Sequence, residues 1–105
     1  MKHTKSEDFV DLAPRTEDEI NRAAERLTDL VWYNRHLNLK INLERGVEAV
    51  DPKIWEGALQ AAESVRSKYA ASELGPWTDF EWGMINGKLS AIRWVLGDDW
   101  DDLDT

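Results

Sequence analysis

A capping box opens the first of three helical segments in this chain. Thr16 is followed three residues later by Glu19, the spacing at which each side chain can accept the other's backbone N–H. Apolar residues follow at heptad spacing, which predicts one helix over about residues 16–45, roughly 44 Å long at about 1.5 Å per residue. Apolar and polar residues also alternate strictly over residues 37–44, which is the pattern of a strand. We favour the helix because Gly46 then stands where a helix would stop.

Two further segments carry start and stop signals of their own. Asp51 can cap a helix with Pro52 at its first position, where the missing N–H costs nothing, and Gly75 ends that segment. Thr78 and Glu81 form a second capping box. The sequence therefore predicts an all-α fold, an antiparallel bundle of three main helices with a long first helix and a short acidic C-terminal segment. We expect about 65–75% helix, against roughly one-third in typical globular domains.

Small residues mark one side of the second and third segments. Gly83 and Gly87 lie one turn apart inside the third segment, where each costs about 1 kcal/mol relative to alanine. The second segment has a small-residue strip of Gly57, Ala58, Ala61 and Ala62 and an apolar stripe of Ile54, Ala58, Ala61, Val65 and Tyr69. Since small side chains let two backbones approach closely, we expect the second helix to pack tightly on the third. The alternative is a ligand lying against bare backbone.

The composition excludes several classes of protein. The 105 residues contain no cysteine, which rules out disulfide scaffolds, thiolate zinc sites and cysteine nucleophiles and indicates a cytoplasmic location. No run approaches the roughly 18 apolar residues of a membrane span. The net charge of -8 predicts repulsion from phosphate backbones and anionic membranes, so we expect no direct binding of nucleic acid or membrane. We expect a single helical domain over residues 16–105, preceded by an N-terminal arm, residues 1–15.

The C-terminal fifth of the chain resembles part of a protein family. The stretch from Phe80 to Trp100, FEWGMINGKLSAIRWVLGDDW, is similar to the C-terminal ends of a family of small uncharacterised bacterial proteins. The resemblance implies a bacterial origin and no activity. No functional residue follows from it.

Heptad spacing in the first segment predicts a dimer seam. The seam residues are Leu27, Leu30, Asn34, Leu37 and Ile41. One asparagine in an apolar seam fixes register and oligomeric state at some cost in stability, although Asn34 could instead face solvent. Trp32, His36, Leu39 and Leu43 fall at helical spacing on a second face of the same segment. Because the first helix is longer than the others, another copy would best bury its overhang and this second face. We therefore expect a homodimer.

Three side chains of the first segment could form a polar site. Asp29, Tyr33 and His36 fall at i, i+4 and i+7 and so share one face of a helix. One carboxylate and one imidazole make only half of a metal or proton-transfer site, which a second copy could complete. We favour a hydrogen-bonded polar cluster on a half-exposed face. No catalytic residue, metal or other cofactor is assigned.

The chain ends in an acidic segment with two large apolar residues. Its predicted partner-binding residues are Asp98, Asp99, Trp100, Asp101, Asp102 and Leu103. The apolar pair would supply contact area, and the carboxylates would steer and select the partner. The alternative is a tail whose Trp100 and Leu103 fold back on the core.

These observations favour a non-enzymatic interaction or regulatory module that uses its acidic C-terminal face on a basic protein surface. The alternative is a small all-α metal-dependent nucleotide hydrolase, whose magnesium would need carboxylates paired on facing helices. The interiors of the second and third segments offer only Glu56, Glu63 and Glu81, without the Glu-x-x-Glu spacing usual in such sites.

Overall fold

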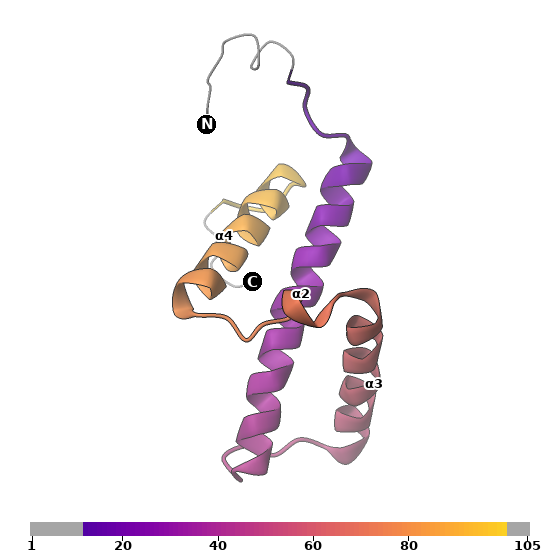
Figure 1. Cartoon of the computed structure of the whole chain (residues 1–105), viewed down its shortest axis with the longest axis vertical. Helices are drawn as coiled ribbons and strands as arrows, with labels where there is room; N and C mark the ends of the chain where they lie inside the picture. Colours follow the sequence, from indigo (N-terminus) through magenta and orange to yellow (C-terminus); the bar gives the residue numbers. More distant parts are fainter. Residues whose placement is uncertain (1–11, 101–105) are drawn as a thin grey trace.

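All regular structure in the described part of the chain is helical. The computed structural model describes residues 12–100 and contains, in chain order, α2 (Glu17–Glu44), α3 (Pro52–Lys68), the short 3-10 helix η1 (Ala71–Glu73) and α4 (Asp79–Val95) (Figure 1). Its helical content is 73%. The prediction of an all-α fold with a long first helix is confirmed, and the strand alternative is wrong because α2 continues to Glu44.

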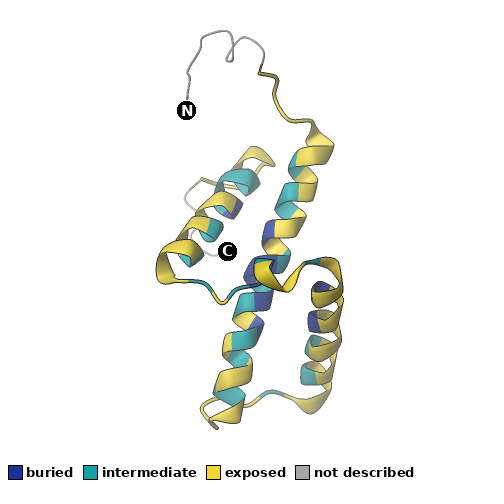
Figure 2. Ribbon diagram, viewed as in Figure 1, coloured by how far each residue is buried: buried dark blue, intermediate teal, exposed yellow. Residues whose placement is uncertain are grey.

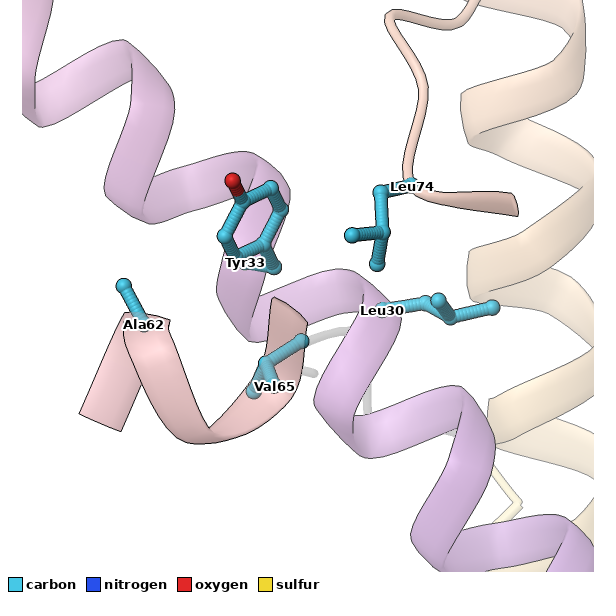
Figure 3. Close-up of a cluster of buried hydrophobic side chains, with 5 residues drawn as sticks. All are labelled: Leu30, Tyr33, Ala62, Val65 and Leu74. Atoms are coloured by element: carbon cyan, nitrogen blue, oxygen red, sulfur yellow. The ribbon is translucent and has the colours of Figure 1, made fainter. Parts of the chain in front are cut away.

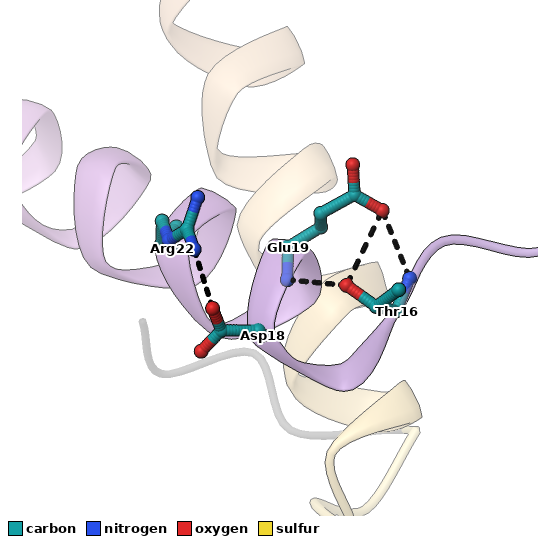
Figure 4. Close-up of polar contacts among 4 residues, drawn as sticks. All are labelled: Thr16, Asp18, Glu19 and Arg22. Carbon is teal, nitrogen blue, oxygen red and sulfur yellow. Dashed lines mark hydrogen bonds and ion pairs between the residues drawn. The ribbon is translucent and has the colours of Figure 1, made fainter.

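Reciprocal hydrogen bonds begin two of the helices where the sequence places them. Thr16 Oγ1 accepts the Glu19 amide at 3.1 Å, and the Glu19 carboxylate accepts the Thr16 amide at 2.9 Å (Figure 4). Thr78 and Glu81 repeat both bonds at the start of α4, at 3.1 and 2.9 Å. At the start of α3, the Asp51 side chain accepts a hydrogen bond from the Lys53 backbone amide. These bonds satisfy amides that have no partner inside the helix.

The shorter helices lie along different halves of α2. Both α3 and α4 run antiparallel to it, α3 beside its C-terminal half and α4 beside its N-terminal half (Figure 1). The close packing of α3 on α4 that we expected is therefore wrong: a Cβ atom added at Gly57, Gly83 or Gly87 would meet no atom within 4 Å. Each helix buries its apolar face on α2, so the glycines lie on open surface.

A first cluster of buried side chains holds α3 on α2. It consists of Leu30, Tyr33, Ala62, Val65 and Leu74 (Figure 3). The stripe predicted on α3 is off by one residue at two places, since Ile54 and Ala61 are exposed while Trp55 and Ala62 face α2. This rotation covers the large indole of Trp55 and leaves the smaller Ile54 in solvent.

A second cluster holds α4 on α2. Leu27, Val31 and Leu89 are its buried members, and Trp82, Ile85 and Ile92 pack around them. Figure 2 shows buried positions gathered on the middle of α2, where both clusters meet, and exposed positions recurring along α4. None of the helices in the described range combines the length and the apolar character needed to cross a bilayer.

Candidate functional site

The predicted dimer seam lies partly inside the chain's own core. Leu27 is buried against α4 and Leu30 against α3, while Leu37 packs at the edge of the first cluster. Asn34 is half-buried, and Ile41 is 44% exposed. A charge introduced at Leu30 would therefore disrupt the monomer itself, and of the five seam positions Ile41 is the exposed one.

Asp29 connects α2 to the end of α3. Its Oδ2 atom accepts a hydrogen bond from Tyr69 Oη at 2.7 Å and pairs with Lys68 Nζ at 2.8 Å. The bond to Asp29 raises the pKa of Lys68, whereas burial, followed by the same carboxylate, raises the pKa of Tyr69. Nearby, Arg26 binds Glu73 of η1 at 2.7 Å and lowers the pKa of that carboxyl. Asp29 thus belongs to a group of polar contacts that fastens the chain after α3 to α2.

Tyr33 borders a hollow between α2 and the segment after α3. The hollow has a volume of about 290 Å³, and its lining includes Tyr33, Leu37, Arg66, Tyr69, Leu74 and Pro76. The Arg66 guanidinium in its wall already has two hydrogen-bond partners, because it donates to Tyr33 Oη at 3.2 Å and to Glu63 at 2.6 Å. The hollow therefore presents a mostly apolar wall without a set of free polar groups that could carry a reaction.

His36 is buried between two tryptophans. Its ring is stacked on Trp32 at a centroid distance of 5.1 Å and on Trp55 at 5.0 Å, and the residue is only 5% exposed. Within residues 12–100 the imidazole ring makes no hydrogen bond or ion pair. Burial, and then the positive charges of Arg66 and Lys40, lower the pKa of His36 and favour the neutral ring. The three predicted polar residues therefore share a face of α2 without forming the hydrogen-bonded cluster that we expected: the Tyr33 and His36 rings contact each other at a centroid distance of 6.2 Å, and Asp29 binds Lys68 and Tyr69.

The arrangement of acidic and imidazole groups bears on the metal-site alternative. Among residues 12–100, no three His, Asp or Glu side chains lie close enough together to hold a metal ion. Asp29 is engaged with Lys68 and Tyr69, and His36 is enclosed by indoles. The described residues thus supply no assembled ligand set for the predicted half-site.

The predicted partner-binding residues begin just after α4. Asp98, Asp99 and Trp100 are all exposed, and the Trp100 ring meets the Trp94 ring edge-on at a centroid distance of 5.1 Å. Trp94 is 52% exposed and Trp100 is 60% exposed. We call Trp94, Asp98, Asp99 and Trp100 the C-terminal surface. The other predicted members, Asp101, Asp102 and Leu103, lie outside the described residues.

Gly97 makes the contact between the two tryptophans possible. Its φ of 118° lies in a region that side chains rarely adopt, and it turns the chain at the end of α4. Trp100 consequently returns to the last turns of the helix instead of extending beyond it. Sequence reasoning identified Trp100 but not its contact with Trp94, although Gly97 next to the aspartates signals such a turn.

Comparison with known proteins adds no assignment. No family model, no curated protein and no solved structure matches this chain. The resemblance of residues 80–100 to a bacterial family therefore stays a prediction.

Proposed function

We propose that this protein is a non-enzymatic interaction module that binds a basic protein surface through its acidic C-terminal end. The observation that supports this proposal is the C-terminal surface, where two tryptophans are each more than half exposed beside Asp98 and Asp99. Tryptophan is enriched among the residues that dominate binding energy at protein interfaces. Two of them in contact on an open surface are suited to anchor a partner.

The tryptophan pair sets the strength expected of such binding. An aromatic side chain buries about 150–250 Å² when covered, so Trp94 and Trp100 have roughly 250 Å² between them still to bury. At about 25 cal/mol per Å² this area contributes roughly 6 kcal/mol before the cost of association, which is about 4–15 kcal/mol. The pair alone therefore gives weak binding, and further contacts must come from charge.

Charge supplies the selectivity in this proposal. Asp98 and Asp99 are exposed and belong to a chain of net charge -8, which attracts basic partners and repels acidic ones. Because attraction between exposed charges is screened beyond a Debye length of about 8 Å at physiological ionic strength, binding should weaken as salt is added.

An array of lysine- and arginine-rich peptides, half of them with an added Leu or Phe, tests the proposal. The peptide bound best is then titrated against Trp100→Ala and against the double variant Asp98→Asn/Asp99→Asn. We expect each to weaken binding at least tenfold. The matched control is Glu44→Gln/Glu56→Gln, which removes two exposed carboxylates elsewhere and should change affinity less than threefold. Equal losses in both double variants would show that only net charge matters and would contradict a defined site.

The stability of Trp100→Ala separates docking from a role in the fold. Because Trp100 is 60% exposed, its truncation should lower the free energy of unfolding by less than about 1 kcal/mol, against about 3–5 kcal/mol for a buried tryptophan. Urea unfolding followed by circular dichroism measures this difference. A loss in the higher range would mean that the C-terminal segment completes the core.

A further inference from the structure

The side of α4 turned away from α2 is apolar along the helix. Phe80, Met84 and Trp94 are 74%, 46% and 52% exposed, and they follow one another at spacings that keep them on one face. Gly87 and Ala91 lie between them on the same face, with Gly83 and Val95 at its edges. We call these seven residues the outer face of α4; no charged side chain belongs to it.

The two glycines of the outer face are costly inside the monomer. Each destabilises a helix interior relative to alanine. Nothing in the described part of the chain uses the space they leave, because a Cβ atom at Gly83 or Gly87 would meet no atom within 4 Å. Bare helix backbone beside large exposed side chains is the arrangement in which a second helix can approach closely.

The outer face is complementary to a second copy of itself. Part of its pattern is symmetric about Gly87: Phe80 lies seven residues before it and Trp94 seven residues after it, and Gly83 and Ala91 lie four residues to either side. The symmetry does not extend to Met84 and Val95, whose counterparts are Ser90 and Asp79. If two copies of α4 cross antiparallel at Gly87, Phe80 of each lies opposite Trp94 of the other, and Gly83 lies opposite Ala91. Large residues then meet at both ends and small ones at the centre. This is the isologous relation of a two-fold dimer.

The exposed area agrees with a modest dimer. The exposed parts of Phe80, Met84, Trp94 and Val95 amount to roughly 450 Å² per copy, or about 900 Å² for two copies if all of it is covered. This lies just below the about 1,000 Å² that a specific interface exceeds, so the dimer is a weak one. An uncharged face also suits self-association in a chain of net charge -8, whose copies otherwise repel one another.

We infer that two copies of this protein form an antiparallel dimer through the outer face of α4, with the two-fold axis at Gly87. The inference goes beyond the proposed function and shares only Trp94 with the C-terminal surface, since Asp98, Asp99 and Trp100 lie outside the outer face. Gly87 and Phe80 belong to the outer face alone, so variants at these two positions test the dimer separately from partner binding. It also differs from the seam predicted on α2, whose Leu27 and Leu30 are already buried.

A single thiol tests the position of the axis directly. The chain contains no cysteine, so Gly87→Cys carries one thiol, and two such thiols on a two-fold axis come within the Cα separation of about 4.4–6.8 Å that a disulfide needs. We expect mild oxidation to convert most of the Gly87→Cys protein to a covalent dimer on a non-reducing gel. Gly57→Cys is the matched control on α3, where the added side chain also meets open space, and it should stay largely monomeric. Equal cross-linking of the two variants would overturn the inference.

Association without a cross-link is tested with Gly87→Leu and Phe80→Asp. We expect sedimentation equilibrium to give wild-type particles approaching twice the 12.1 kDa chain mass, and each variant to raise the dimer dissociation constant at least tenfold. Gly87→Leu should keep or raise the monomer's melting temperature because leucine favours helix more than glycine. Gly57→Leu should show the same thermal effect without a change in association.

Three results would overturn the dimer. They are a wild-type protein that is monomeric at about 1 mM, a dimer unaffected by Gly87→Leu, and a dimer dissociated by Ile41→Asp instead, which would put the interface on α2. Salt distinguishes this surface from the C-terminal surface. Because salt screens repulsion between two copies of net charge -8, it should strengthen the dimer while it weakens binding of a basic peptide.

Discussion

Leu89 is the side chain whose removal tests the packing of α4 most directly. It is 1% exposed and contacts Leu27 and Val31 of α2. Leu89→Ala removes three carbon atoms, which corresponds to roughly 2.4 kcal/mol of lost transfer free energy at about 0.8 kcal/mol per carbon. The cavity left behind adds to this, and comparable buried leucines cost about 2.7–5 kcal/mol. We therefore expect Leu89→Ala to lower the free energy of unfolding by about 3–4 kcal/mol.

Urea unfolding followed by circular dichroism measures that loss, and the melting temperature should fall by about 12 °C or more, at about 4–8 °C per kcal/mol in a domain of this size. Ile54→Ala on α3 is the control, because Ile54 is 68% exposed and its truncation should cost less than about 1 kcal/mol. If Leu89→Ala loses no more stability than Ile54→Ala, then α4 is not held on α2 through Leu89 and the second cluster is wrongly described.

Two further predictions concern the polar face of α2. Because the pKa of His36 is lowered in the folded protein, the unfolded chain takes up a proton first as pH falls below about 6.5. The folded protein therefore loses stability on acidification below that pH. The urea midpoint of His36→Phe should accordingly change less between pH 7 and pH 5 than that of wild type. An equal decline in both proteins would exclude His36 as the cause. Tyr69→Phe removes the donor to Asp29 and should cost about 1 kcal/mol at pH 7, measured by the same unfolding assay, whereas no loss would show that Lys68 satisfies the carboxylate alone.

The helix boundaries were predictable because they depend on residues close together in sequence. Thr16 and Thr78 each satisfy an amide three residues away, so the capping patterns alone located the starts of α2 and α4. The stack of Trp32 on His36 was equally accessible, since residues four apart share a helix face.

Contacts between distant segments could not be predicted in the same way. Tyr69 reaches Asp29 across 40 positions, and no local pattern specifies that pairing. The expected packing of α3 on α4 failed for a related reason: small residues show that a backbone can be approached but not which helix approaches it. On the candidate site, the sequence left open whether Trp100 faces a partner or folds back on the core. Asp98, Asp99 and Trp100 are exposed, and Trp94 joins the C-terminal surface through a turn at Gly97 that periodicity does not describe.

The division of α2 between two partners has a consequence for how the molecule responds to disturbance. Leu27 and Leu30 are neighbours on one helix, yet they belong to different clusters, one shared with α4 and the other with α3. The molecule thus consists of two antiparallel helix pairs, α2 with α3 and α2 with α4, that share α2. A change at the outer face of α4 or at the C-terminal surface can therefore reach α3 by two routes. One is the backbone of α2 between these two leucines, and the other is the stack of Trp77 on Trp82, whose ring centroids lie 6.0 Å apart and join the first cluster to the second. Loosening one pair would shorten the length of α2 that is held in place, and the shared helix would then fray within the other pair as well.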